Sequence, residues 1–457
     1  METTKNHMKT LDINHLAKAL DGEERNIKLM NISPRGVSIS TKEDLQNKIF
    51  VPLTGTKADG HDFITEAFAK GATLVFSQKD LNINMPYIRV ESTPAALKAF
   101  AGYYRNFFDV PIVGITGSVG KTTTKDMTAS ILSQKYNTLK TRGNFNNEIG
   151  LPLTIFNLRE NINACVLEMG MNQKGEIHNL ARIARPTIAI ITNIGDAHIE
   201  FLGSRENIFK AKSEILDYDP KDIILNGDDE MLIRLKSETK AKFYYLNDPA
   251  KEYTAYNIVH HQLKGTAATL KISGEEIHVQ IPIPGDYMVR NALAGAVAGK
   301  ILGLNSEEIK AGIESFSPSQ NRMDITELGN LTLINDVYNA SPAGVKSMLD
   351  LLAEQKGKRI AILGDMFELG EYAPSLHKEL GEYPAENTLD LLISIGPLSQ
   401  YIHENTRVPG YYFSTKEEFM ASSIFKEILQ EQGVVLVKAS RGMYFEEIVN
   451  KIREIKQ

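Results

Sequence analysis

A glycine-rich segment, residues 114–124, is the part of the sequence best suited to chemistry. Its sequence is Gly-Ile-Thr-Gly-Ser-Val-Gly-Lys-Thr-Thr-Thr, with an apolar run (residues 110–115) leading into it and a stretch compatible with a helix (residues 126–132) after it. Glycines let a backbone turn sharply and direct its N–H groups at phosphate oxygens, and the start of a helix adds partial positive charge. In such a loop Lys121 reaches the outer phosphates and the Thr122 hydroxyl binds Mg²⁺. The segment therefore predicts a nucleoside triphosphate site, although the first glycine, Gly114, stands one residue earlier than the strict pattern requires.

Three stretches are predicted as α/β domains that position this loop. Residues 1–107 form a small first domain, with strands at 48–53, 73–77 and 87–90 and helices at 63–70 and 94–107. Residues 108–317 alternate strands (111–115, 164–168, 187–192, 222–226) with helices, as in a largely parallel sheet, and add a hairpin (269–272 with 277–283) and a closing helix (288–302). Residues 318–457 repeat the α/β pattern, with strands at 331–336, 359–363, 391–395 and 434–437.

Polar residues follow several of these strands, where open α/β sheets bind their ligands. Glu168 ends one strand and is a candidate second Mg²⁺ ligand opposite Thr122. Taken alone, it is equally a solvated carboxylate. His198 lies in a loop and Lys212 on a helix, so each taken alone is typical of a surface residue. Asp336 ends a strand of the third domain, where it could meet a ligand.

Composition and charge exclude several classes of protein. The net charge of −6 does not suggest a nucleic-acid partner, and no apolar run is long enough for a transmembrane helix or a secretory signal. The single cysteine, Cys165, excludes a disulfide framework and fits a reducing cytoplasm. It lies in an apolar run and is predicted as a buried strand residue. No strand is followed by a dinucleotide-binding glycine motif.

The order of these motifs resembles that of the Mur ligases, ATP-dependent enzymes that form amide bonds in peptidoglycan synthesis. The resemblance covers nearly the whole chain and is carried by residues 114–127, 141–154, 167–171, 192–198, 210–215, 291–294, 321–323, 335–342 and 363–370, with His377. The phosphate loop is shared with folylpolyglutamate synthases. Residues 143–154, Tyr338-Asn339 and residues 364–370 are most similar to the members that add D-alanyl-D-alanine to UDP-N-acetylmuramoyl-tripeptide.

The resemblance implies a role for each matching residue. The phosphates of ATP are held by the loop residues Gly117, Ser118, Gly120, Lys121, Thr122 and Thr123. Thr122 and Glu168 bind a first Mg²⁺, and His198 and Lys212 bind a second. Lys212 is expected to be carbamylated, because an ammonium repels Mg²⁺ whereas a carbamate is an anionic oxygen donor. Asn291 lies near the adenine, Arg322 and Asp336 reach ATP from the third domain, and Asn146, Asn147, Tyr338 and Asn339 lie on the substrate side.

Two segments depart from the family pattern. Where the first domain usually carries Asp-Ser-Arg for the UDP end of the substrate, this chain has Ser40-Thr41-Lys42, so Lys42 and residues 59–63 are expected to take that role. Tyr287-Met288 stands where His-Asn is usual before the Asn291 helix, which removes one contact on the adenine side.

The resemblance predicts an ATP- and Mg²⁺-dependent ligase that forms an acyl phosphate on UDP-N-acetylmuramoyl-tripeptide and transfers the acyl group to D-alanyl-D-alanine. It also implies a cytoplasmic monomer that does not insert into a membrane. Two alternatives remain at this point: another member of the superfamily, namely a diamino-acid-adding ligase or a folylpolyglutamate synthase, and a non-catalytic nucleotide-binding protein. The presence of Lys121, Glu168, His198 and Lys212 weighs against the non-catalytic alternative.

Overall fold

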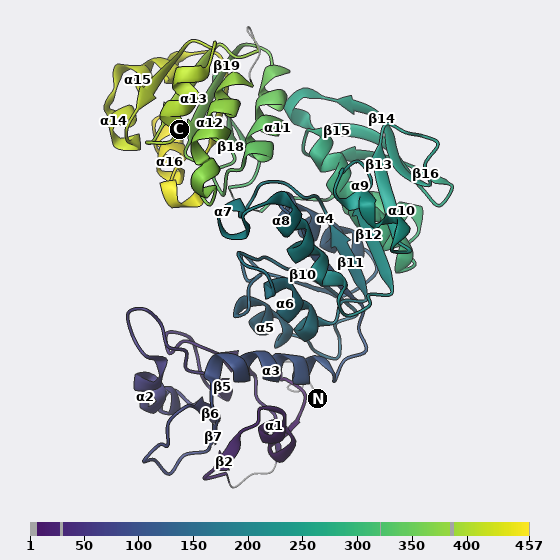
Figure 1. The fold of residues 1–457 in the computed structure, drawn as a ribbon, viewed down its shortest axis with the longest axis vertical. Helices are drawn as coiled ribbons and strands as arrows, with labels where there is room; N and C mark the ends of the chain where they lie inside the picture. The colour runs from purple at the N-terminus through teal and green to yellow at the C-terminus, as the bar shows by residue number, and fades with distance from the viewer. Residues whose placement is uncertain (1–6, 28–30, 320, 384–387, 457) are drawn as a thin grey trace.

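The computed structural model describes residues 7–27, 31–319, 321–383 and 388–456. Within them the chain forms a mixed α/β structure with three large sheets, arranged one after another along the long axis (Figure 1). The first sheet lies at the N-terminal end, the nine-stranded sheet lies in the middle, and the six-stranded sheet lies at the C-terminal end. The predicted α/β fold class is confirmed.

The first sheet has five short strands in the order β2-β7-β6-β5-β4, parallel except for the β2–β7 pair. Its strands are β2 (Glu23–Arg25), β4 (Gly36–Ser38), β5 (Lys48–Phe50), β6 (Leu74–Ser77) and β7 (Tyr87–Arg89). A separate pair joins β1 (Leu11–Asp12) to β3 (Asn31–Ile32). The helices are α1 (Ile13–Ala19), α2 (Ile64–Ala69) and α3 (Thr93–Arg105), and a 3₁₀ turn at Gly60–Phe63 precedes α2.

The middle sheet carries the phosphate loop at its centre. Its order is β16-β15-β14-β13-β12-β11-β8-β10-β9, and all pairs from β14 to β9 are parallel. These strands are β8 (Ile112–Thr116), β9 (Thr138–Lys140), β10 (Ala164–Glu168), β11 (Ile188–Ile191), β12 (Asp222–Asn226), β13 (Lys242–Leu246) and β14 (Tyr253–His260). Strand β8 is buried at every position between β10 and β11, so the loop that leaves its carboxyl end has a rigid base.

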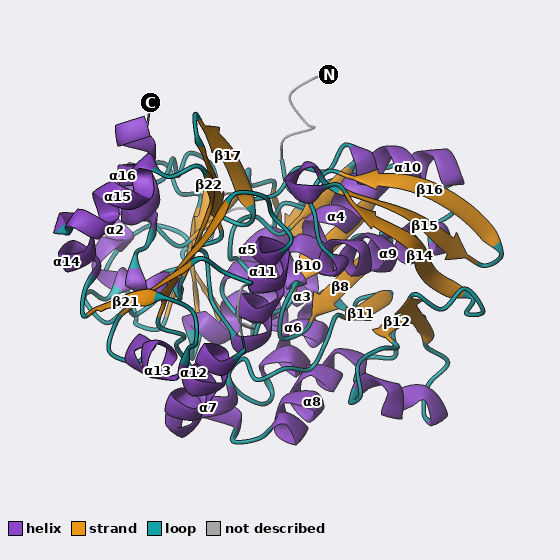
Figure 2. Cartoon of the chain, turned by 90° about the horizontal axis from the view of Figure 1, so that it is seen from above, coloured by secondary structure: helices purple, strands orange, loops and turns teal. Residues whose placement is uncertain are grey.

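Strands β15 (Thr266–Ile272) and β16 (Glu275–Ile281) extend this sheet in antiparallel fashion, and Figure 2 shows β14 to β16 projecting from the body of the molecule. The helices around the middle sheet are α4 (Lys121–Leu132), α5 (Gly150–Ile155), α6 (Glu176–Ala184), α7 (Ile199–Leu202), α8 (Arg205–Ser213), α9 (Asp286–Ile301) and α10 (Ser306–Glu314). Helix α4 packs on α9 and α10. Helices α4 and α10 pack closely, because a Cβ on Gly312 of α10 would lie 2.4 Å from the Cα of Ile131 of α4.

The third sheet has the order β17-β18-β22-β19-β20-β21 and is parallel except for the β17–β18 pair. Its strands are β17 (Asp324–Leu328), β18 (Leu331–Asn335), β19 (Lys358–Gly364), β20 (Leu391–Ile395), β21 (Gly410–Phe413) and β22 (Gly433–Lys438). The helices are α11 (Pro342–Ala353), α12 (Ala373–Glu382), α13 (Ser399–Asn405), α14 (Lys416–Ala421), α15 (Ser423–Gln430) and α16 (Glu446–Lys456).

Specific hydrogen bonds join the three parts. At the end of α3, the buried Arg105 guanidinium donates to the carbonyls of Phe108, Val110 and Ala184, which ties the first part to the middle sheet. In the segment that leads to the third sheet, the Ser319 hydroxyl donates to Oδ2 of Asp126 at 2.6 Å. Asp126 belongs to α4, the helix that begins at the phosphate loop.

The structure adds elements that the sequence analysis did not predict. Strands β13 and β14 lengthen the middle sheet, and α10 follows the helix expected to close that domain. Helix α10 begins with a capping box, in which Asn305 and Glu308 each accept a hydrogen bond from the other's backbone N–H. Cys165 is fully buried in β10 as predicted, and burial raises the pKa of its thiol to about 12. No helix in the described residues is long and apolar enough to cross a membrane.

Candidate functional site

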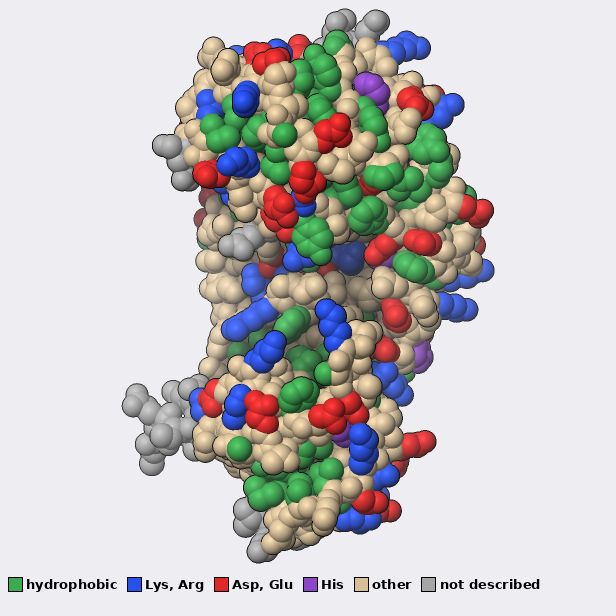
Figure 3. Space-filling model, turned by 90° about the vertical axis from the view of Figure 1, so that its left-hand side faces the viewer, with side chains coloured by type: hydrophobic (Ala, Val, Ile, Leu, Met, Phe, Trp, Pro, Cys, Tyr) green, Lys and Arg blue, Asp and Glu red, His purple; other side chains and the backbone are tan. Residues whose placement is uncertain are grey.

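A cleft of about 660 Å³ lies between the middle and third sheets, and residues of both parts line it. Figure 3 shows the molecule hollowed at mid-height, with Lys and Arg side chains gathered around the hollow. Of the predicted site residues, the cleft is lined by Ser118, Gly120, Lys121, Thr122, Thr123, Asn146, Asn147, Glu168, His198, Asn291, Arg322, Asp336, Tyr338 and Asn339. The structure thus brings together side chains that lie up to about 220 positions apart in the sequence.

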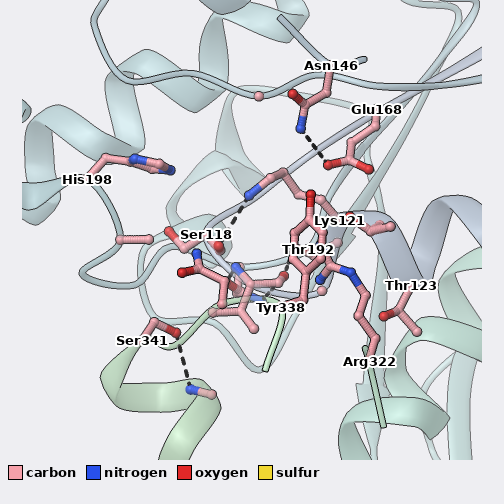
Figure 4. A pocket seen from close by; sticks show the side chains of 18 of the residues that line it. Ser118, Lys121, Thr123, Asn146, Glu168, Thr192, His198, Arg322, Tyr338 and Ser341 are labelled. Atoms are coloured by element: carbon pink, nitrogen blue, oxygen red, sulfur yellow. Dashed lines mark hydrogen bonds between the residues drawn. The ribbon is translucent and has the colours of Figure 1, made fainter. Parts of the chain in front are cut away.

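The phosphate loop runs from the end of β8 to the first turn of α4. Gly117 and Gly120 have φ values of +149° and +84°, which side chains rarely allow. A Cβ on Gly117 would also lie 1.9 Å from the Thr192 hydroxyl. Lys121 Nζ donates to the carbonyls of Gly117 at 2.9 Å and Ser118 at 3.3 Å, so the lysine folds over its own loop (Figure 4). The first N–H groups of α4 have no partner within the helix and are available to an anion.

Glu168 provides a buried carboxylate beside this loop. Its side chain is 2% exposed, and Oε1 accepts a hydrogen bond from Asn146 Nδ2 at 2.7 Å (Figure 4). The other oxygen, Oε2, is buried and has no hydrogen-bond partner among the described residues. A buried anionic oxygen without a partner fits a cation such as Mg²⁺, which prefers oxygen ligands.

Lys212 is buried on helix α8, not solvated as its sequence context alone suggested. It is 1% exposed, and its Nζ donates to the carbonyl of Gly117 at 2.9 Å. Burial, together with the nearby charge of Lys121, lowers the pKa of Lys212 well below its usual value. An amine with a lowered pKa is neutral more often at neutral pH, and a neutral amine is the form that reacts with carbon dioxide.

His198 is also largely buried, in contrast to the surface position suggested by its loop context. Its side chain is 16% exposed, and its Nδ1 lies 2.8 Å from Oε2 of Glu368 in the third part of the chain. Burial lowers the pKa of His198, and the contact with His198 lowers the pKa of Glu368. Both residues have left-handed φ values, +66° and +63°, a backbone conformation that non-glycine residues seldom adopt outside functional or tightly held sites.

The contact between His198 and Glu368 is part of a larger junction. Helix α7, which follows His198, packs on the 3₁₀ turn at Gly370–Tyr372. Within it, the N–H of Glu200 donates to the carbonyl of Glu368 at 3.4 Å and the Tyr372 hydroxyl donates to the carbonyl of Gly203. The sequence analysis did not assign a role to Glu368, although it lies in one of the segments that carry the family resemblance.

Asn291 is held beside the phosphate loop from helix α9. Its Oδ1 accepts a hydrogen bond from the hydroxyl of Thr124 at 3.0 Å, and both side chains are buried. Tyr287 and Met288, which replace the family's usual His-Asn, also line the cleft. The Tyr287 hydroxyl is buried and has no hydrogen-bond partner in the described parts of the chain. The departure from the family pattern therefore leaves a polar group at this end of the cleft.

The third part contributes a cationic and aromatic wall. The Arg322 guanidinium stacks 3.7 Å from the centroid of the Tyr338 ring (Figure 4), and Arg441 lies 4.8 Å from the same centroid. Lys438 forms an ion pair with Asp336 and donates to the carbonyl of Asn339 at 2.9 Å. Lys438 and Arg441 were not predicted, because the sequence shows only that they follow an apolar strand.

Lys42 does not belong to this cleft. It is exposed in the first part of the chain, where its N–H donates to the Ser40 hydroxyl at 3.2 Å. In the neighbouring segment, Asp59 contacts His61 and Lys79, and the hydrogen bonds with His61 contribute most to lowering the pKa of Asp59. The predicted UDP-binding residues thus lie apart from the phosphate loop.

Comparison with known proteins places the chain in a family. The model of the Mur ligase middle domain matches residues 115–299, that of the Mur ligase glutamate ligase domain matches residues 321–441, and that of the Mur ligase family catalytic domain matches residues 27–105. The chain is 36% identical to the UDP-N-acetylmuramoyl-tripeptide–D-alanyl-D-alanine ligase of Bacillus subtilis (strain 168), over 97% of this chain and 98% of that protein.

Two solved structures are similar over almost the whole chain. The crystal structure of MurF from Acinetobacter baumannii matches with a TM-score of 0.90 at 27% identity, covering 98% of this chain and 99% of that one. The crystal structure of MurF ligase from Thermotoga maritima in complex with ADP matches with a TM-score of 0.82 at 28% identity, covering 92% of this chain and 97% of that one.

Proposed function

The chain belongs to the Mur ligase family, and we propose that it joins a carboxylate of UDP-N-acetylmuramoyl-tripeptide to the amine of D-alanyl-D-alanine, with conversion of ATP to ADP and phosphate. The B. subtilis relative is named for this reaction, and the T. maritima structure holds ADP. One observation carries the proposal: a single cleft is lined by a phosphate loop, a buried carboxylate and an imidazole, with polar groups of the third part facing them.

The reaction proceeds through an acyl phosphate. A carboxylate oxygen of the tripeptide attacks the γ-phosphorus of ATP, the bond to ADP breaks, and an acyl phosphate forms. The amine nitrogen of the dipeptide then attacks the acyl carbon, the tetrahedral intermediate expels phosphate, and the amine proton is lost. Lys121 and the N–H groups of the loop neutralise charge on the transferring phosphoryl group. Closure of the third domain over the cleft excludes water, which would hydrolyse the acyl phosphate.

We assign the nucleotide to Gly117, Ser118, Gly120, Lys121, Thr122, Thr123 and Asn291, with Arg322 and Asp336 reaching it from the third domain. All of them except Gly117 line one cleft, and Gly117 directly precedes Ser118 in the loop, which supports this assignment. The tripeptide and dipeptide lie against Asn146, Asn147, Tyr338 and Asn339, and Lys42 holds the UDP end in the first domain. The domains are residues 1–107, 108–317 and 318–457. We also propose that the enzyme is a cytoplasmic monomer.

The residues present also fit Mg²⁺, which supplies positive charge that stabilises the phosphoryl group in transfer when it is bound. Thr122 and Glu168 would hold one ion, since the hydroxyl borders the cleft and Glu168 Oε2 is a buried oxygen without a partner. The described residues contain no cluster of three or more His, Cys, Asp or Glu side chains that could hold a metal by themselves. A site with one carboxylate, such as that of Thr122 and Glu168, still suits Mg²⁺, which commonly takes one or two carboxylates and completes its shell with water and phosphate oxygens.

His198 and a carbamylated Lys212 would hold a second ion. An unmodified ammonium beside Gly117 would repel the metal, whereas the carbamate is an anion with oxygen donors. The lowered pKa of Lys212 supports this modification, because the unprotonated amine is the reactive form. The catalytic residues that we propose are therefore Lys121, Glu168, His198 and Lys212.

An assay of ADP release with UDP-N-acetylmuramoyl-tripeptide as the acyl donor tests the proposal directly. We expect ADP release with D-alanyl-D-alanine and little with single amino acids such as diaminopimelate or glutamate. A preference for a single amino acid would refute the substrate assignment in favour of another superfamily member. Absence of ADP release with every nucleophile would favour a non-catalytic nucleotide-binding protein.

A further inference from the structure

Five carboxylates line the cleft, and their partners differ. They are Glu148, Glu168, Glu176, Asp336 and Glu368. The incoming dipeptide carries an ammonium group before its nitrogen attacks, and a buried ammonium requires an anionic or polar partner. A carboxylate that binds this ammonium must have an oxygen that no other group of the protein occupies.

Two of the five are engaged at the edge of the cleft near the first domain. Glu148 accepts hydrogen bonds from Lys98 Nζ at 3.1 Å and Asn179 Nδ2 at 2.7 Å. Glu176 accepts from the backbone N–H groups of residues 172 and 173. Glu148 therefore has a cationic partner, whereas Glu176 uses a single oxygen, Oε2, for two backbone N–H groups just before its own helix.

Two more are engaged in the centre of the cleft. Glu168 accepts from Asn146, and its remaining oxygen is the one assigned above to Mg²⁺. Asp336 is paired with the Lys438 ammonium, and its Oδ1 also accepts from the N–H of Met323 at 3.3 Å.

Of the two cleft carboxylates that the third part of the chain supplies, Asp336 and Glu368, Glu368 is the one that keeps free capacity. Its side chain is 43% exposed, and among the described residues its carboxylate contacts His198 Nδ1. No Lys or Arg nitrogen of the described residues lies within 4.0 Å of it. Its backbone is fixed by the junction with α7, so the carboxylate stands at a defined place beside His198, on the side of the cleft that the third domain supplies.

We propose that Glu368 binds the ammonium group of the incoming D-dipeptide. The inference rests on the proposed function and names the residue that receives the nucleophile. The location is suitable because His198 borders the phosphate loop, where the acyl phosphate forms, and a nucleophile must come within about 3–3.5 Å of the acyl carbon. An ion pair with Glu368 places the nitrogen for that approach, and the ammonium then loses one proton so that the neutral amine, which has a lone pair, attacks.

The test compares two ligands that differ only in the amine. Propionyl-D-alanine has the shape of D-alanyl-D-alanine but carries hydrogen in place of the amino group. We expect the wild-type enzyme to bind the dipeptide roughly tenfold to a hundredfold more tightly than this analogue, since hydrogen bonds between charged groups are among the strongest. In Glu368→Gln the KM for the dipeptide should rise by a similar factor, the preference over the analogue should disappear, and the KM for ATP should not change.

Glu371→Gln is the matched control. Glu371 lies three residues away, is exposed, and does not line the cleft, so the same loss of charge there should leave both KM values unchanged. Glu368→Asp, which keeps the charge on a shorter side chain, should fall between the wild type and Glu368→Gln.

A partial reaction separates this role from an effect on His198. Hydroxylamine, which is largely uncharged at neutral pH, traps the acyl phosphate as a hydroxamate without any dipeptide. We expect Glu368→Gln to form the hydroxamate at close to the wild-type rate, which also shows that the variant is folded. Loss of hydroxamate formation together with peptide formation would overturn the inference in favour of a role through His198.

Failure of the inference and failure of the proposed function give different results. If the wild type uses D-alanyl-D-alanine but Glu368→Gln retains its KM and its preference over the analogue, the inference alone is wrong. If the wild type does not use D-alanyl-D-alanine, the proposed function is wrong and the inference fails with it.

Discussion

Replacing Thr124 by valine tests how the protein holds Asn291 beside the phosphate loop. The Thr124 hydroxyl donates to Asn291 Oδ1 at 3.0 Å, and both side chains are buried between α4 and α9. Valine keeps the shape but leaves the buried amide oxygen without a donor. Such an oxygen costs about 1–3 kcal/mol. For a domain of this size about 2 kcal/mol corresponds to a decrease in Tm of about 4–8 °C.

Thr128→Val is a matched control on the same helix. Thr128 lies one turn after Thr124 and is equally buried, but its hydroxyl has no hydrogen-bond partner among the described residues. Replacing it by valine removes an unsatisfied polar group, so the free energy of unfolding should stay the same or increase by about 1 kcal/mol. The two variants delete the same atom and differ in whether that atom has a partner.

Thermal unfolding followed by circular dichroism, with and without ADP, measures the Tm of both variants, and steady-state kinetics measure their KM for ATP. Thr124→Val should lower Tm and also raise the KM for ATP, because Asn291 lines the cleft. Thr128→Val should not lower Tm and should leave the KM for ATP unchanged. Equal decreases in Tm for the two variants would show that packing of the threonine side chains, not the bond to Asn291, determines the result.

Three further predictions concern the reaction. Lys212→Ala should be inactive and should not recover with added bicarbonate, because no amine remains to be carbamylated; a structure with ATP analogue and Mg²⁺ in which Lys212 is unmodified and turned to solvent would contradict this. Arg322→Ala should reduce kcat more than it reduces ATP binding to the open enzyme, as measured by titration calorimetry, since we assign Arg322 to the nucleotide from the third domain; equal losses would indicate a permanently formed site. Lys42→Ala should raise the KM for the UDP-linked substrate and leave the KM for ATP unchanged; no change in either would place the uridine site elsewhere in residues 1–107.

Local sequence patterns predicted the parts of the fold that depend on local interactions. Strand β10 has the predicted bounds because Ala164–Glu168 is one continuous apolar run ended by a carboxylate, and it is buried throughout. The start of α4 was placed at residue 126, five residues late, because Thr122, Thr123 and Thr124 are poor helix formers. In the structure this first turn is fixed by the loop and by the Thr124–Asn291 bond. Helix α10 was missed although Asn305 and Glu308 form a capping box.

The candidate site depends more on long-range packing, which local sequence patterns do not predict. The loop from Gly117 to Thr123 follows from local spacing, but the positions of Arg322 and Asp336 relative to it depend on how two sheets pack, and only the family resemblance suggested them. Neither the local sequence pattern nor the family resemblance pointed to Glu368. Its free carboxylate can be recognised only when the partners of the other carboxylates that line the cleft are known. Burial of Lys212 is likewise a property of packing, since Lys210 on the same helix is exposed.

The hydrogen bond between Ser319 and Asp126 has a thermodynamic consequence for this enzyme. Helix α4 starts at the phosphate loop and carries Asp126 less than two turns later, so one short helix contacts both the loop that we assign to the nucleotide and the segment leading to the third domain. If nucleotide binding and movement of that segment both displace this helix, the two events share one coupling free energy, and linkage makes the effect reciprocal. The factor by which ATP favours docking of the third domain is then the same factor by which docking tightens ATP. A mutation at Asp126 or Ser319 would change both quantities by equal amounts, although neither residue belongs to the set that we assign to the nucleotide.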